Sequence, residues 1–185
     1  MLIFLFRRRT AFMLVGTIAL LFVARTTPES FGYGLPLVVI GGLIRVWSAG
    51  SLRKLECLVT SGPFALCRNP MYVGSFLITC GYLIMCRRLD VGIIGFVLFW
   101  LFHGSAIVRE ERMLKDKFGE SYETYCKSVP RFVPCFNLSG AKGGFSLNLL
   151  SENLEWRSAL SSLVVTALFG LIAYGMIPLE LLGCQ

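Results

Sequence analysis

The chain has 185 residues, of which 55% are hydrophobic and 16% are charged, and its mean hydropathy is +0.69. Soluble domains carry about 25% charged residues, so this composition excludes an ordinary soluble domain. The aromatic content of 13% excludes a disordered chain. Seven cysteines that form no CxxC pair argue against a disulfide scaffold and against a cysteine metal centre. The composition therefore indicates an integral membrane protein.

The apolar segments, taken in chain order, predict an all-α protein with about five membrane helices, because a bilayer is spanned by about 20 apolar residues. The first follows Arg7, Arg8 and Arg9 and has a cleaved signal peptide as its alternative reading. The second contains Arg45. The expected spans are 10–25, 31–51, 70–86, 91–108 and 159–182. All of 1–185 then forms one membrane domain, with residues 137–157 as a polar linker before an additional C-terminal span in 158–185.

The positive charges predict the orientation of these spans, because Lys and Arg accumulate in cytoplasmic loops. With five spans, 14 of the 18 Lys and Arg residues fall on the side of the N-terminus. We therefore expect the N-terminus to be cytoplasmic and the C-terminus to lie on the opposite side. The net charge of +7 then marks a membrane face and not a nucleic-acid surface.

Two loops on the expected cytoplasmic side carry the residues of chemical interest. In the first, Gly62 and Pro63 predict a turn, Asn69 is a good helix N-cap, and Pro70 suits the first helical turn. These features also fit a loop whose only role is to enter the third span. Local sequence alone leaves both interpretations open.

The second loop begins as a helix that continues from the fourth span. On a helical wheel, Ile107, Leu114 and Phe118 form an apolar stripe, and Glu110 and Glu111 lie on or beside it. Arg109, Arg112 and Asp116 fall on the opposite face. A carboxylate on a buried face needs a partner, and at membrane depth it is a functional candidate. The alternative is structural pairing, of Glu111 with Lys115 and of Glu110 with a loop arginine.

Beyond these glutamates, the sequence offers few reactive residues. Gly119 is expected to close the helix. His103 is the only histidine, so it does not form a metal site with this set of cysteines, and no metal is expected. It is expected either to pack in the fourth span or, like Arg109, to contact a substrate.

Several motifs occur in a fixed order along the chain. They are Leu58-Val59-Thr60-Ser61-Gly62-Pro63-Phe64, Arg68-Asn69-Pro70-Met71-Tyr72-Val73-Gly74, Arg109-Glu110-Glu111, Phe118-Gly119-x-x-Tyr122-x-x-Tyr125 and Val129-Pro130-x-Phe132-x-Pro134. Together they resemble the isoprenylcysteine carboxyl methyltransferase and phospholipid methyltransferase superfamily. The resemblance covers residues 42–136, the expected catalytic core.

The resemblance implies a membrane methyltransferase that uses S-adenosylmethionine and takes a lipid or lipidated acceptor from the bilayer. The cofactor would lie at the cytoplasmic membrane surface, between the loop before the third span and the glutamates after the fourth. Catalytic roles would fall to Glu110, Glu111 and Asn69, and low-ranked acceptor contacts to Arg109 and His103. The implied cofactor contacts are Cys57, Leu58, Val59, Phe64, Asn69, Pro70, Met71, Tyr72, Glu110 and Glu111.

The sequence departs from the carboxyl methyltransferase pattern at three positions. Asn69 stands where those enzymes usually have His, Phe64 where they have Tyr, and Ala106 where they have an Arg that holds the substrate carboxylate. These residues are more similar to the phosphatidylethanolamine methyltransferase branch, in which a second carboxylate would serve as the base for an amine. The acceptor therefore stays open between a carboxylate and an amine. An NADPH-dependent sterol-type reductase and a non-enzymatic membrane assembly component are the other interpretations.

Overall fold

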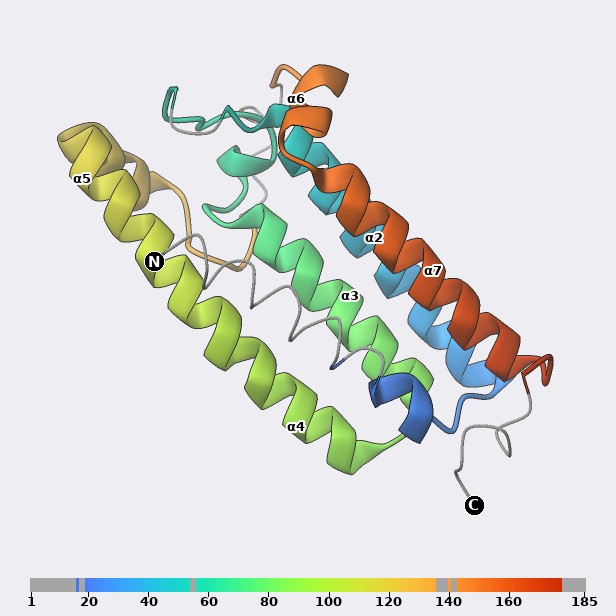
Figure 1. Cartoon of the computed structure of the whole chain (residues 1–185). Helices are drawn as coiled ribbons and strands as arrows, with labels where there is room; N and C mark the ends of the chain where they lie inside the picture. The colour runs from blue at the N-terminus through green and yellow to red at the C-terminus, as the bar shows by residue number, and fades with distance from the viewer. Residues whose placement is uncertain (1–15, 17–18, 54–55, 136–139, 141–142, 178–185) are drawn as a thin grey trace.

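The computed structural model describes residues 16, 19–53, 56–135, 140 and 143–177, and its described elements are all helical. The long helices lie alongside one another, and the short helix α6 lies at one end of them (Figure 1). The elements are α2 (Pro28–Ser51), η1 (Gly62–Ala65), α3 (Pro70–Cys86), α4 (Leu89–Phe99), η2 (Trp100–Gly104), α5 (Ser105–Ser128), α6 (Leu147–Glu152) and α7 (Glu155–Ala173).

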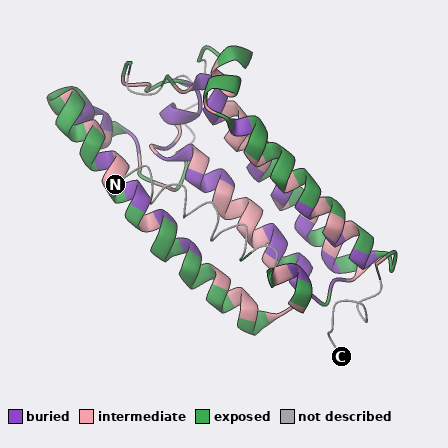
Figure 2. Cartoon of the chain, viewed as in Figure 1, coloured by how far each residue is buried: buried purple, intermediate pink, exposed green. Residues whose placement is uncertain are grey.

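Three of the described helices are long and apolar enough to cross a membrane. They are α2, the continuous helix Leu89–Ser128 and α7, while α3 is apolar but shorter, at 17 residues. Figure 2 shows exposed residues along the outer sides of α4 and α7, and many of these are large and apolar, such as Ile93, Leu101 and Leu163. This is the surface expected of helices that face lipid. Half of the predicted first span, 10–25, lies outside the described residues, and residues 19–23 within it are helical.

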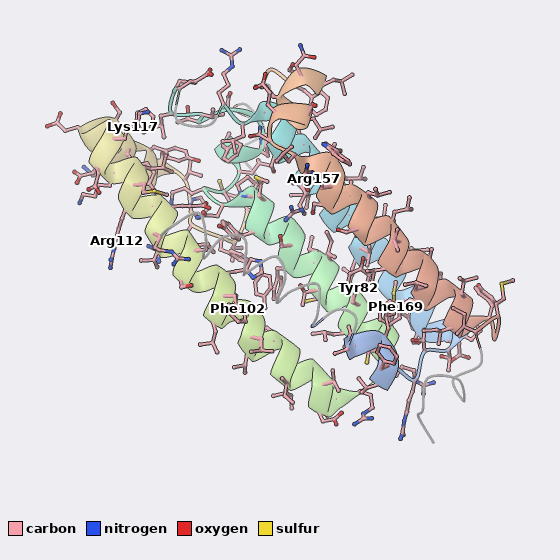
Figure 3. The ribbon with its side chains drawn as sticks, in the orientation of Figure 1. Tyr82, Phe102, Arg112, Lys117, Arg157 and Phe169 are labelled. Carbon is pink, nitrogen blue, oxygen red and sulfur yellow. The ribbon has the colours of Figure 1, made fainter. Side chains whose placement is uncertain are left out.

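The α2 and α3 helices approach closely because both carry glycine at their contact. A Cβ atom added to Gly41 would lie 2.5 Å from the Gly74 carbonyl oxygen, and one added to Gly74 would lie 2.6 Å from the Gly41 oxygen. Small residues of this kind allow backbone-to-backbone packing in membranes. Helix α3 also contacts α7, where the Tyr82 and Phe169 rings stack with centroids 5.6 Å apart (Figure 3).

The observed helices differ from the expected boundaries in two places. The expected fourth span, 91–108, is part of one continuous helix in which η2 is a π-helical segment between α4 and α5. Helix α5 breaks at Gly119, as expected, where φ is 51° and ψ is −124°. The expected linker, 137–157, contains α6, and α7 begins at Glu155 and ends at Ala173 instead of spanning 159–182. The polar residues that suggested a linker make contacts with α2 instead.

Candidate active site

The two loops singled out in the sequence meet at one end of the helices. The segment before α3, the first turn of α3, the polar half of α5 and the segment 129–135 converge there (Figure 1). Two backbone hydrogen bonds join the segments, from Arg68 N to the Pro130 oxygen at 2.8 Å and from Cys135 N to the Leu66 oxygen at 2.9 Å. The Tyr125 hydroxyl donates to the Phe64 carbonyl oxygen at 2.6 Å. The loop is therefore held by main-chain contacts from the residues that follow α5.

Glu111 is the buried carboxylate of this region, with 9% of its surface exposed. Its Oε2 lies 2.7 Å from Arg131 Nη2, and its Oε1 accepts from Arg131 Nε at 3.2 Å and lies 3.5 Å from Arg68 Nη1. The expected pairing with Lys115 is wrong, since Lys115 binds Glu123 at 2.9 Å. Two arginines from separate loops thus balance the charge of Glu111, which ties those loops to α5.

The Asn69 side chain also binds Glu111. Asn69 occupies the N-cap position of α3, but its side chain makes no capping hydrogen bond. Its Nδ2 instead donates to Glu111 Oε1 and to the Arg131 carbonyl oxygen, both at 3.1 Å. Both N–H bonds of the amide are thereby used, and its orientation is fixed. The expected capping role is therefore replaced by a link between the loop, α5 and the segment 129–135.

Glu110 lies beside this network in a different environment. It is half-buried, and its Oε1 accepts a 2.7 Å hydrogen bond from the Tyr72 hydroxyl. The Tyr72 ring contacts the His103 ring edge-to-face, with centroids 5.6 Å apart. Ala106 is fully buried and packs with Tyr72 and Ile107. The carboxylate of Glu110 is thus bound to an aromatic hydroxyl at the boundary between the apolar and polar halves of the long helix.

His103 is positioned by the π-helical segment η2. It is 3% exposed, its ring stacks on Phe99 with centroids 4.1 Å apart, and its Nδ1 lies 3.1 Å from the Phe99 carbonyl oxygen. Because a carbonyl oxygen only accepts, a hydrogen bond at this contact requires a proton on Nδ1. π-helical segments occur frequently at functional sites. The structure therefore places His103 next to Tyr72. The sequence suggested His103 only as a packed residue or an acceptor contact.

The helical wheel is right for most of α5 and wrong for Arg109. Ile107 and Glu111 are buried, and Arg112 and Asp116 are exposed, as the wheel predicts. The side chain of Arg112 lies on the outside of α5 (Figure 3). Arg109 is half-buried and its Nε atom is buried. A wheel assumes a single packing face, and this assumption fails where the helix leaves its apolar half.

The remaining predicted cofactor contacts lie along the loop before α3. Cys57, Leu58 and Val59 line a cavity of about 270 Å³, and Leu58 also packs against the Tyr122 and Tyr125 cluster. The Ser51 hydroxyl is buried beside this cavity with no hydrogen-bond partner among the described residues. The full lining is Ser51, Arg53, Cys57, Leu58, Val59, Thr60, Ser61 and Gly144. Phe64 and Pro70 are buried, and Met71 is half-buried.

Burial and charge alter two side chains at the end of this loop. Burial raises the pKa of the Cys67 thiol to about 11. Burial alone would lower the pKa of Arg68, but the charge of Glu111, with contributions from Cys126 and Tyr122, raises it above its ordinary value. Arg68 therefore stays charged beside Glu111, and Cys67 stays a neutral thiol.

Sequence reasoning missed four residues that complete this region. Arg68 and Arg131 balance Glu111, and Ser51 and Gly144 line the cavity. Arg68 belongs to a motif quoted above and Arg131 lies at an unspecified position within another. Because a buried glutamate needs a cation nearby, their pairing had a sequence signal. Ser51 and Gly144 had none, because their proximity depends on how the segment after residue 142 folds back onto α2.

The profile of the phospholipid methyltransferase family matches residues 30–121, about half of the chain. A cobalt-zinc-cadmium resistance protein, CzcN, from Cupriavidus metallidurans is 33% identical over 120 residues, which is 64% of this chain and 54% of that protein. Two relatives are named protein-S-isoprenylcysteine O-methyltransferases. The one from Schizosaccharomyces pombe is 35% identical over 46% of this chain and 36% of its own length. Form B from Arabidopsis thaliana is 31% identical over 57% of this chain and 59% of its own length.

The matches to these three relatives thus cover between about a third and three fifths of each relative's own length. No solved structure matches the chain significantly. The family profile and the isoprenylcysteine methyltransferase relatives agree with the ordered motifs of the loops, and the apolar helices agree with a membrane location. The chain is an integral membrane member of the superfamily that unites phospholipid methyltransferases with isoprenylcysteine carboxyl methyltransferases.

Proposed function

We propose that this protein is a membrane methyltransferase that takes its methyl group from S-adenosylmethionine and transfers it to a lipophilic acceptor. The observation that carries the proposal is the pairing of Glu110 with Tyr72 at the apolar boundary, next to a second glutamate that two arginines already balance. We assign Glu110, bound to Tyr72 at this boundary, to the methyl-donor site, while Glu111 holds the surrounding loops. The sequence resemblance implied ligand contact for both glutamates, with Glu110 as the acidic contact.

The residues present fit this methyl donor. A sulfonium cation is stabilised by a carboxylate and by aromatic rings, which Glu110 and Tyr72 supply. Leu58 and Val59 offer apolar surface for the adenosine portion of the molecule, and the Ser51 hydroxyl offers a polar contact. S-Adenosylmethionine supplies an electrophilic methyl group. The protein would contribute alignment of the acceptor with that group, and alignment is worth up to about 7–11 kcal/mol.

The charges around Glu110 favour an amine as the acceptor over a carboxylate. A carboxylate acceptor needs a cation, but Arg68 and Arg131 are engaged by Glu111, and the buried Ala106 offers none. An amine at the apolar boundary would be attracted to Glu110. It must also lose a proton before it attacks, and Glu110 is the carboxylate that we assign to accept it. An ethanolamine phospholipid, which would enter from the bilayer, has this chemistry.

The proposed orientation places the site on the cytoplasmic side. The excess of Lys and Arg on the side of the N-terminus supports this, with five spans and the C-terminus opposite. A cytoplasmic site also suits a donor that is soluble and charged. Accessibility labelling of single cysteines introduced near residues 112 and 176 in intact cells tests the orientation, because only the site near residue 176 should react from outside.

Transfer of radiolabelled methyl groups tests the proposed reaction. Purified protein in detergent is incubated with methyl-labelled S-adenosylmethionine and either total lipid extract or a prenylcysteine analogue. Label in ethanolamine phospholipids supports the proposal, whereas label in the prenylcysteine carboxylate would support the methyltransferase and overturn the amine acceptor. Absence of transfer to both, together with absence of donor binding, would overturn the proposed function.

A further inference from the structure

An ion pair between α2 and α7 connects the C-terminal part of the chain to the first turn of α3. Arg45 Nε lies 2.7 Å from Glu155 Oε1, and Arg45 Nη2 lies 2.9 Å from Glu155 Oε2. Glu155 is 4% exposed and is separated from Arg45 by 110 positions. This is a two-point carboxylate–guanidinium contact, the geometry that makes such pairs strong and directional. It fixes the start of α7 against the middle of α2.

The same arginine is linked through a serine to the first turn of α3, which contains predicted cofactor contacts. Arg45 Nη1 donates to Ser75 Oγ, and Ser75 Oγ donates at 3.0 Å to the carbonyl oxygen of Met71. Met71 lies in the first turn of α3, next to Tyr72 and within the predicted cofactor contacts. A continuous series of hydrogen bonds therefore runs from Glu155 to the turn that carries Tyr72. The series is polar and partly buried, so a change at Glu155 removes the charged partner of Arg45.

The segment that precedes α7 forms part of the cavity wall. Gly144 lines the cavity with Leu58 and Val59. Its neighbour Gly143 lies against Gly62, where an added Cβ atom would sit 2.8 Å from the Gly62 nitrogen. Residues 143–144 therefore pack against the loop that contains Gly62. They lie outside the residues that the family profile matches.

Three further contacts hold this segment to the end of α2. Ser146 N donates to the Gly50 oxygen at 2.8 Å. Asn153 Nδ2 donates to the Ala49 and Leu52 oxygens at 2.8 and 2.9 Å, and so satisfies carbonyl groups at the helix terminus. Residues 143–157, which we term the C-terminal clasp, are therefore a fixed part of the region around the cavity.

We propose that the C-terminal clasp completes the methyl-donor site and that Glu155 is a positioning residue for it, acting through Arg45 and Ser75. This inference rests on the proposed function. Glu155 does not contact the donor. It keeps Arg45 oriented toward Ser75, which holds the Met71 and Tyr72 turn, and it anchors the segment that carries Gly144 at the cavity. Loss of the ion pair therefore weakens donor binding more than acceptor binding.

The test compares Glu155→Gln with Tyr82→Phe, a control that removes a different contact to the same helix, α7. The Tyr82 hydroxyl bonds the Ser162 carbonyl oxygen at 2.9 Å, so its removal also loosens α7, but far from the cavity. Variants are purified in detergent and assayed for S-adenosylmethionine affinity, for the KM of the acceptor and for thermal stability. Glu155→Gln should raise the donor Kd about tenfold and leave the acceptor KM unchanged. Tyr82→Phe should lower thermal stability without changing the donor Kd.

The double variant Arg45→Gln with Glu155→Gln adds a rescue. It replaces an unpaired buried cation by two neutral amides, so it should recover most of the donor affinity that Glu155→Gln loses. Equal donor affinity in the wild type and Glu155→Gln would overturn the proposal. An equal loss of affinity in Glu155→Gln and Tyr82→Phe would overturn it as well, because the effect would then follow from loosening α7 anywhere.

A second readout does not depend on the methyl donor. Cys67 is 2% exposed within the loop against which the clasp packs. Alkylation of Cys67, followed by peptide mass spectrometry without any ligand, reports opening of that loop. It should be faster in Glu155→Gln than in the wild type and in Tyr82→Phe. If the wild type binds no S-adenosylmethionine, the proposed function fails, but this labelling still decides whether the clasp holds the loop.

Discussion

The Tyr72 hydroxyl donates a 2.7 Å hydrogen bond to Glu110 Oε1, and this contact joins the first turn of α3 to α5 where α5 becomes polar. Replacing Tyr72 by Phe removes the hydrogen bond and keeps the ring against His103 and Ala106. A hydrogen bond to a charged group contributes about 1.5–3 kcal/mol. Because Tyr72 holds Glu110 at the proposed donor site, we expect Tyr72→Phe to weaken S-adenosylmethionine binding about tenfold, measured by calorimetry, and to lower the free energy of unfolding by up to about 3 kcal/mol. Unchanged affinity would contradict the placement of the Tyr72 hydroxyl in the ligand site.

Glu111 is expected to act on stability more than on ligand contact. Glu111→Gln leaves Arg68 and Arg131 without their shared carboxylate and should lower the free energy of unfolding by about 1.5–3 kcal/mol. Lys115→Ala breaks only an exposed pair with Glu123 and should cost less than about 1 kcal/mol. Unfolding in mixed micelles measures both values. Similar small losses in the two variants would contradict the anchoring role of Glu111.

The sequence predicted the helices of this region better than the partners within it. The 70–86 helix and the break at Gly119 follow from local residue preferences, and the structure confirms both. Glu111 was identified as buried by its position on one helical stripe, but its partners come from two loops whose approach depends on the whole fold. The pair between Arg45 and Glu155 was not predicted for the same reason, because 110 positions separate its members.

Close packing of α2 and α3 is expected to depend on the glycines at their contact. A Cβ atom at Gly74 would lie 2.6 Å from the Gly41 oxygen and 2.7 Å from Arg45 Cγ, so Gly74→Ala should destabilise the protein by about 1–3 kcal/mol. Gly92 on α4 has nothing within 4 Å of such an atom. Gly92→Ala should therefore stay within about 0.5 kcal/mol of the wild type. Thermal unfolding in detergent compares the two variants, and equal effects would contradict the observed helix contact.

The reactivity of two cysteines should differ strongly with pH. Cys57 is exposed at the cavity, whereas Cys67 is buried with a pKa of about 11. Only the thiolate reacts, and a raised pKa means that about one Cys67 thiol in a thousand is ionised at pH 8. Maleimide labelling at pH 8 should therefore modify Cys57 and spare Cys67, and Cys67 labelling should rise only as the pH approaches 11. Labelling of both cysteines at equal rates at pH 8 would contradict the burial of the loop that contains Cys67.

The most direct test of the central claim is the equilibrium binding of S-adenosylmethionine to the wild type, Glu110→Gln and Arg112→Gln. Arg112 is exposed on the outer side of the same helix and serves as the charge-changing control. The wild type and Arg112→Gln should bind with similar affinity. Glu110→Gln should bind about 10- to 100-fold more weakly, because it lacks the charge that we propose stabilises the sulfonium. Equal affinity in all three proteins, or no binding by the wild type, would contradict the assignment of Glu110 and its partner Tyr72 to the methyl-donor site.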